Sequence, residues 1–185
     1  EELLLLNPFR AQLSPAVFAA PALPPSTAAP QSLRENLRQA RALLQAAGWT
    51  YQNGALRNAK GEAFSIELLI YSPIFERIAA PYQRNLEKLG IVLTTRFADS
   101  ALYQRRMDNV EYEMAVMSIG QSQSPGNEQL GYFHSKSADK AGSNNALGIK
   151  NKVVDALVEN LIQAPNRRAL ITACRALDRV LWSEY

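Results

Sequence analysis

Few side chains in this sequence have a type and spacing that could support catalysis. His134 is the only histidine and Cys174 is the only cysteine, so no site with several imidazole or thiolate ligands can be built from the chain. Cys174 is in register with Leu170, Leu177 and Leu181, which predicts a buried core thiol on an apolar helix face. We therefore expect neither a metal site nor a cofactor.

Two glycine-containing stretches superficially match motifs of enzymes. Gly120-Gln-Ser122-Gln-Ser124 is similar to a nucleophile elbow, but serine replaces the last glycine and Pro125 stands where a helix should begin. Gly126-Asn-Glu-Gln-Leu-Gly131 lacks the Lys-Ser/Thr ending of a phosphate-binding loop. A hydrolase is thus the disfavoured alternative, and the sequence predicts a protein that is not an enzyme.

Polar residues begin abruptly after an apolar, strand-like segment at residues 112–119. Ligands of open α/β sheets bind beyond the carboxyl ends of strands, where polar side chains and free backbone groups can hydrogen-bond them. We therefore predict a ligand-binding site here, and composition alone leaves open a solvent-exposed loop that binds nothing. The predicted site residues are Ser118, Gly120, Gln121, Ser122, Ser124, Asn127 and Glu128.

Three apolar segments predict the sheet that positions this site: residues 64–71, 91–97 and 112–119. The first two flank a helix, with an apolar face from Phe75 to Leu89, that Gly90 closes. A strand, a helix and a strand within 34 residues predict a parallel pair with the helix on one face. The third segment is apolar on both sides, as expected for a central strand. The fold class is therefore α/β, in two or three layers.

Helices and turns are expected on both sides of this unit. Ser32-Leu-Arg-Glu35 is a capping box that starts a helix, and Gly48 ends that helix. Asn53-Gly54 is a turn pair typical of a short hairpin. The other expected elements are a short helix capped by Asp99, a long loop over residues 120–148, and two helices around residues 154–161 and 170–181.

Proline is concentrated at the start of the chain. Six of the ten prolines lie within the first thirty residues, so we expect no regular structure there. We predict a connecting arm at residues 1–30 and an α/β lobe at residues 31–185. Leu3 to Leu6 follow two glutamates where a signal peptide would carry Lys or Arg, so no export signal is expected, although a piece of a secreted precursor would look the same.

The formal net charge of +3 raises the question of a nucleic-acid partner. Arg34, Arg38 and Arg41 are spaced along one expected helix among Glu35 and Gln39, which is typical of a solvated surface. We expect no nucleic-acid partner. No apolar run approaches the roughly 18 residues needed to span a bilayer, so no membrane span is expected.

Several segments of the sequence occur in the order and with the spacing that are typical of one protein family. They are Leu-Leu-Gln-Ala-Ala-Gly48-Trp49, the run from Phe75 to Ile91, Gly120 to Gln129, Gly148-Ile149, Val154-Asp155-Ala-Leu157 and Arg175 to Leu181. On these residues the chain resembles the peptide-binding group of the extracellular solute-binding proteins of ABC transporters. The segment Ser124-Pro-Gly-Asn-Glu-Gln129 is similar to the corresponding segment in the branch of this family that binds oligopeptides and peptide antibiotics.

This resemblance implies a periplasmic-binding-protein-like lobe, with a mixed sheet, a strand-helix-strand crossover and flanking helices. It would be the later lobe of a bilobed receptor whose first lobe is missing from this chain. It implies a periplasmic protein that binds an oligopeptide or similar solute for a membrane-embedded ABC permease. A sensory or protein-interaction domain that uses the same lobe is the alternative.

The resemblance also implies how the solute would be held. The strand at residues 113–120 would pair with the ligand backbone through main-chain groups of Ser118 and Gly120. Ser122 stands where the family normally has an aspartate that holds the peptide's α-amino group. Either Glu128 supplies that charge or the ligand is not an ordinary peptide.

Overall fold

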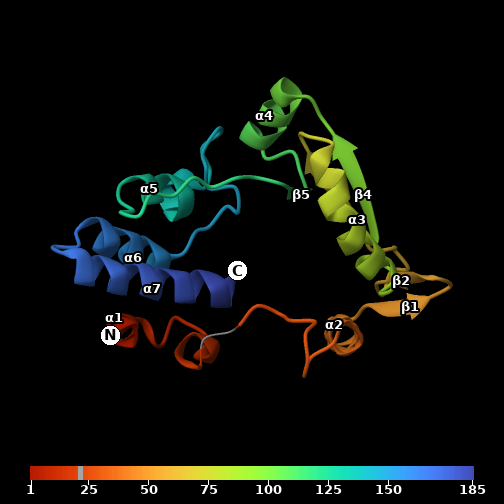
Figure 1. The fold of residues 1–185 in the computed structure, drawn as a ribbon, viewed down its shortest axis with the longest axis horizontal. Coiled ribbons are helices and arrows are strands. Elements are labelled where there is room, and N and C mark those ends of the chain that lie inside the picture. Colours follow the sequence, from red (N-terminus) through yellow and green to blue (C-terminus); the bar gives the residue numbers. More distant parts are fainter. Residues whose placement is uncertain (21–22) are drawn as a thin grey trace. The chain divides into compact units, whose positions relative to one another are not determined.

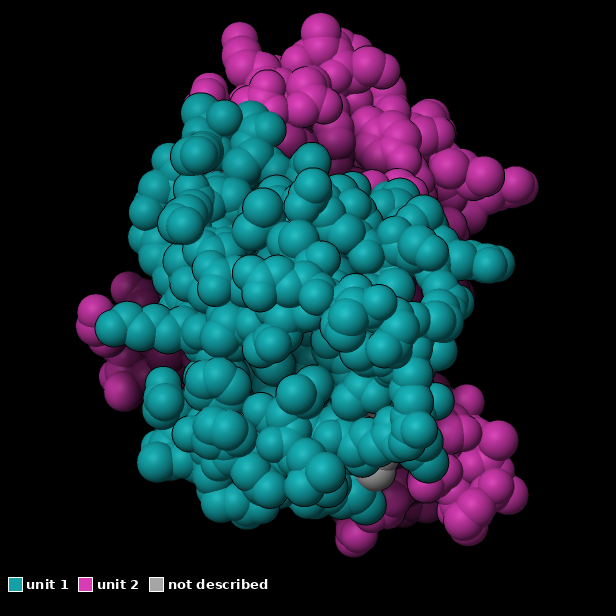
Figure 2. Space-filling view, turned by 90° about the vertical axis from the view of Figure 1, so that its left-hand side faces the viewer, with its two compact units in different colours: residues 1–23, 119–185 teal, residues 24–118 magenta. Residues whose placement is uncertain are grey.

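The computed structural model describes residues 1–20 and 23–185, so Pro21 of the proline-rich segment lies outside the described residues. The chain forms two compact units. We call Pro24–Ser118 the α/β unit, and Glu1–Leu23 together with Ile119–Tyr185 the helical unit (Figure 2). No helix of the described residues is long and apolar enough to cross a membrane.

The α/β unit contains the expected crossover. Strand β3 (Ser65–Ile70) pairs in parallel with β4 (Val92–Phe97), in a register that runs from Ser65↔Val92 to Ile70↔Phe97. Helix α3 (Ile74–Glu87) connects the two strands and lies along them (Figure 1). The prediction of a parallel pair within an α/β fold is confirmed.

Alternate residues of the strands serve the two faces of this sheet. Leu68, Ile70 and Leu93 are buried together with Ala79 of α3. On the opposite face, Leu69 is buried with Tyr103, which belongs to helix α4 (Ser100–Asp108). Both faces of β3 are therefore covered, which is why its sequence is a nearly continuous apolar run.

The third strand is in the expected sheet but is shorter than expected. Strand β5 (Met114–Ala115) pairs in parallel with β3, and the order is β4-β3-β5, so this sheet is parallel rather than mixed and the antiparallel hairpin forms a separate sheet. The expected central position is wrong, because β5 is an edge strand and β3 is the centre. The Val116 amide still donates to the Leu69 carbonyl of β3 at 3.3 Å, whereas the Val116 carbonyl accepts a hydrogen bond from the Tyr103 hydroxyl.

The flanking elements of this unit follow their local signals. Ser32 Oγ accepts the Glu35 amide at 3.2 Å and caps helix α2 (Leu33–Ala46). Asn53 and Gly54, both with positive φ, turn the antiparallel hairpin. The strands of this hairpin are β1 (Thr50–Gln52) and β2 (Ala55–Arg57). At the start of α4, the Asp99 side chain accepts hydrogen bonds from the amides of Ala101 and Leu102.

The helical unit includes the start of the chain. Leu6 and Val17 are fully buried against a core to which Leu157, Val158 and Val180 contribute. The prediction that the first thirty residues lack regular structure is therefore wrong, because their leucines and Val17 complete this core. The segment forms α1 (Glu2–Leu6) and two 3-10 helices, η1 (Asn7–Phe9) and η2 (Pro15–Phe18).

The expected loop at residues 120–148 is also partly helical. It contains α5 (Glu128–Phe133) and the 3-10 helix η3 (Ser135–Ser137). Phe133 of α5 packs against the core of the helical unit. The last two helices are α6 (Lys152–Ile162) and α7 (Arg167–Glu184), which lie side by side (Figure 1). Cys174 of α7 is half-buried against the core, and burial raises the pKa of its thiol.

Gly90 joins three elements of the α/β unit. Its φ of +81° closes the end of α3, and its carbonyl accepts the Leu56 amide of β2 at 2.8 Å. A Cβ at this position would lie 2.7 Å from the Tyr51 ring and 2.8 Å from the Leu56 nitrogen. The backbone nitrogen cannot move away without breaking the hydrogen bond that joins the hairpin to the crossover.

We predict that Gly90→Ala destabilises the chain by about 3 kcal/mol, because it combines an unfavourable φ with a backbone clash. Gly61→Ala is the matched control, since Gly61 also has a positive φ of +79° but an open surrounding. It should cost only about 1 kcal/mol. Urea unfolding of the two variants measures the difference, and equal losses would contradict the role given to the clash.

Candidate ligand-binding site

One carboxylate organises the loop from Gly120 to Gln129. Glu128 Oε1 accepts hydrogen bonds from the Gln121 side-chain amide at 3.0 Å, from the Gly126 amide at 2.9 Å and from the Gln129 side-chain amide at 3.3 Å. These donors, with Gln121 as the largest contributor, lower the pKa of Glu128 to about 2. The exposed Glu128 side chain is therefore an anion at neutral pH.

The serines of this loop form a tight turn. Ser122 Oγ donates to the Ser124 carbonyl at 2.9 Å and accepts the Ser124 amide at 3.2 Å. Arg167, at the start of α7, donates to the Gln123 carbonyl at 2.6 Å. The Tyr132 hydroxyl of α5 donates to the Gly120 carbonyl at 3.3 Å. Two helices thus hold a loop most of whose side chains remain exposed.

The structure brings most of the predicted site residues into this one network. Gly120, Gln121, Ser122, Ser124 and Glu128 each take part in the hydrogen bonds given above. Asn127 lies in the same loop, but its exposed side chain makes no hydrogen bond to the described residues. Ser118 belongs to the α/β unit. Ligand binding by these seven residues stays a prediction.

Three residues that position the loop were missed in the sequence. Gln129 is only 3% exposed, and its amide donates to the Gln121 side-chain oxygen as well as to Glu128. Tyr132 and Arg167 act from helices. Arg167 had no detectable signal because it lies 44 residues beyond its partner Gln123. A buried glutamine is unusual, but burial becomes visible only once the loop is folded.

His134 has a structural environment. The residue is 4% exposed, Nδ1 accepts the Lys136 amide at 3.1 Å, and its carbonyl accepts the Ser137 hydroxyl at 2.7 Å. Asp155 Oδ1 lies 3.3 Å from Nδ1 and accepts the Ser135 amide. No hydrogen bond joins His134 to Ser122 or Ser124 among the described residues, so the serines have no adjacent imidazole base.

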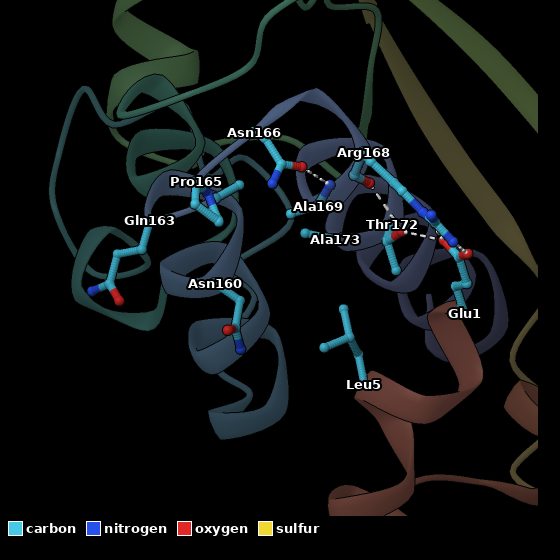
Figure 3. A pocket seen from close by; sticks show the side chains of 11 residues that line it. Glu1, Leu5, Asn160, Gln163, Pro165, Asn166, Arg168, Ala169, Thr172 and Ala173 are labelled. Carbon is cyan, nitrogen blue, oxygen red and sulfur yellow. Dashed lines mark hydrogen bonds and ion pairs between the residues drawn. The ribbon is translucent and has the colours of Figure 1, made fainter.

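A separate hollow of about 480 Å³ lies in the helical unit beside α1, α6 and α7 (Figure 3). Many of its polar groups already have partners. Arg168 pairs with Glu1, Thr172 Oγ1 lies 3.3 Å from the same carboxylate, and Asn166 Oδ1 accepts the Ala169 amide at 3.0 Å. No residue of the Gly120–Gln129 loop lines this hollow, so it does not coincide with the predicted site.

Solved structures establish the class of fold. The oligopeptide-binding protein AppA from Bacillus subtilis, in complex with a nonapeptide, has a TM-score of 0.67 and 23% identity, over 96% of this chain and 36% of AppA. NikZ from Campylobacter jejuni, in complex with Ni(L-His), also has a TM-score of 0.67, with 15% identity over 99% of this chain and 38% of NikZ. The fold is that of a periplasmic-binding-protein lobe, as the resemblance implied.

Sequence comparison then gives the family. Residues 10–141 match the family described as bacterial extracellular solute-binding proteins, family 5 Middle. The probable peptide-binding protein YejA of Agrobacterium fabrum is 40% identical over 181 residues, which are 97% of this chain and 30% of YejA. The chain therefore belongs to solute-binding protein family 5. It spans 28–30% of the length of three curated relatives that it matches.

The low pKa of Glu128 predicts how the stability of the loop depends on pH. Because the folded-state pKa lies below the ordinary value of 4.5, the stabilisation from these hydrogen bonds is complete above pH 4.5 and is lost as the pH falls toward 2. Gln121→Ala removes the largest cause and should move the titration midpoint of Glu128 upward toward its ordinary value. A carboxyl NMR titration measures this shift.

Asn127→Ala is the matched control, because Asn127 is a neighbour of Glu128 whose side chain makes no hydrogen bond to the described residues. The midpoint should stay near 2 in this variant. If both alanine variants shifted the midpoint equally, Gln121 would not be the principal donor to the carboxylate.

Proposed function

We propose that this chain is one lobe of a bilobed periplasmic receptor, which binds an oligopeptide or peptide-like solute and delivers it to a membrane-embedded ABC permease. The first lobe of that receptor would lie outside this chain. The hydrogen-bonded loop from Gly120 to Gln129 carries the proposal, because it exposes backbone groups, hydroxyls and a fixed carboxylate on a supporting layer of helices.

Peptide chemistry fits these groups. A peptide carries backbone donors and acceptors along its length and a positive charge at a free amino end. Gly120 has no side chain, so it allows close approach of a ligand backbone. Ser122 offers a hydroxyl rather than a carboxylate, and Glu128 remains ionised at neutral pH because its pKa is about 2. Glu128 is the anion of this loop that could meet an amino group.

The same geometry favours binding without catalysis. The Ser122 hydroxyl is engaged with the backbone of its own turn, the Ser124 hydroxyl lies 3.5 Å from Arg167 Nη1, and the one imidazole of the chain is buried in a different cluster. The named relatives support this reading, since AppA and YejA are described as binding proteins. A solute such as Ni(L-His), which NikZ binds, is the competing ligand class.

We expect the full-length receptor to be stabilised by oligopeptides, because a ligand that binds only the folded state raises the melting temperature. Thermal-shift measurements with a pool of three- to nine-residue peptides, with Ni(L-His) and with mannohexaose would test this. This 185-residue chain alone should bind the same peptides at least tenfold more weakly by calorimetry, since one lobe supplies only part of the contact. Stabilisation by the nickel chelate or the sugar alone would contradict the peptide assignment.

Gly120→Val should lower the affinity of the full-length receptor for its solute by about tenfold or more, because the side chain obstructs a ligand backbone at this point. A Cβ at Gly120 meets no described atom within 4 Å, and its φ is not positive. The melting temperature without solute should therefore change little. Calorimetric titration and thermal unfolding of the same variant measure both quantities.

Gly131→Val is the control, because Gly131 is another glycine with open space around its Cβ position and lies outside the predicted site. It should leave solute affinity unchanged. If Gly120→Val also left affinity unchanged, the loop would be a surface connection and the site would lie elsewhere.

A further inference from the structure

A basic groove lies on the α/β unit. Its lining residues are distant in the sequence from the loop that is proposed to bind the solute. Its volume is about 840 Å³, and it runs between α2 and the residue that follows α3. Four of its seven lining residues are cationic and one is acidic. The lining residues are Leu33, Arg34, Glu35, Leu37, Arg38, Arg41 and Lys88.

The helix gathers three of these charges on one side. Arg34, Arg38 and Arg41 are four and three residues apart, so they are neighbours on the helix surface over roughly 10 Å of its length. Arg41 Nη2 donates to the Lys88 carbonyl at 3.0 Å, which brings a fourth cation to the same groove from 47 residues away. The interpretation of these arginines as dispersed charges is therefore incomplete, because the sequence did not reveal Lys88 beside them.

Little within the groove neutralises this charge. Glu35 is the one carboxylate among the lining residues, and it pairs with Arg38 at 2.7 Å. Arg34 makes no side-chain hydrogen bond to the described residues. Each guanidinium has five N–H donors, so Arg38 and Arg41 also keep donors beyond their present bonds. The groove thus has an excess of three positive charges and several unused donors.

We propose that this groove is a docking surface for an acidic segment of a protein partner. Planar guanidinium groups bind carboxylates with two parallel hydrogen bonds, and a row of them matches a segment with repeated Asp or Glu. The concave shape and the half-buried Leu33 and Leu37 suit a chain that enters the groove better than a flat lipid surface. We take this partner to be the membrane-embedded permease, and that identification rests on the proposed function.

The experiment uses the full-length receptor and a fluorescent glutamate-rich peptide, with its glutamine counterpart as the neutral probe. The glutamate peptide should bind more tightly, and added salt should weaken it. The variant Arg34→Gln/Arg38→Gln/Lys88→Gln should reduce its affinity about tenfold, which corresponds to roughly 0.5 kcal/mol for each exposed pair. Arg41 is kept because it tethers Lys88.

The control variant Lys60→Gln/Arg77→Gln/Lys140→Gln removes the same charge at exposed positions outside the groove. It should bind the glutamate peptide like the unaltered receptor. Equal losses in the two variants would show attraction by overall charge and overturn the proposal. So would a failure of the glutamate peptide to bind, or groove-dependent binding of phosphatidylglycerol vesicles or inorganic phosphate in its place.

The solute-induced rise in melting temperature should be the same in the groove variant and the unaltered receptor. This separates the two proposals. If solute stabilisation persists while the glutamate peptide fails to bind, the docking surface is wrong and the receptor function stands. If peptide solutes fail to stabilise either protein while the groove binds the acidic probe, the solute assignment is wrong and the docking surface stands.

Discussion

The α/β unit depends on the backbone conformation at Gly90. This residue ends α3 with a positive φ, accepts the Leu56 amide of the hairpin, and leads within two residues into β4. Val92 then donates to the Phe64 carbonyl at 3.0 Å, which starts the parallel pairing. Leu56, Leu89 and Ile91 are buried in one cluster around the junction. A single glycine therefore joins the end of the helix, the hairpin and the start of the parallel pairing.

The Gly120–Gln129 loop is organised in a different way, by hydrogen bonds to a carboxylate and not by burial of apolar surface. Three donors converge on Glu128 Oε1, while most side chains of the loop stay exposed. Such a loop keeps its shape without a core of its own, because Tyr132 and Arg167 connect it to helices. Its exposed polar side chains are hydrated and the buried Gln129 amide is hydrogen-bonded, so the loop carries little cost of unpaired burial.

Sequence patterns predicted what is local. The crossover, the Ser32 cap and the Asn53-Gly54 hairpin each have their signals within a few residues. The failures involve partners outside the local segment. Leu6 is buried by helices that lie about 150 residues further along the chain, and the Val116 carbonyl at the end of the third strand bonds the hydroxyl of Tyr103 rather than a strand. The candidate loop was identified from its polarity, whereas the support from Arg167 required the folded chain.

This division between scaffold and loop explains how one fold can serve different solutes. AppA with a nonapeptide and NikZ with Ni(L-His) have the same TM-score of 0.67 to this chain. The shared part is the packing of sheet and helices, which tolerates substitution on the loops it supports. The resemblance implies such a change at position 122, where the Ser122 hydroxyl closes a turn with Ser124 and Glu128 is the carboxylate of the loop. If the proposed site is right, solute choice would change through a few loop side chains while the positions of α5 and α7 that hold the loop are retained.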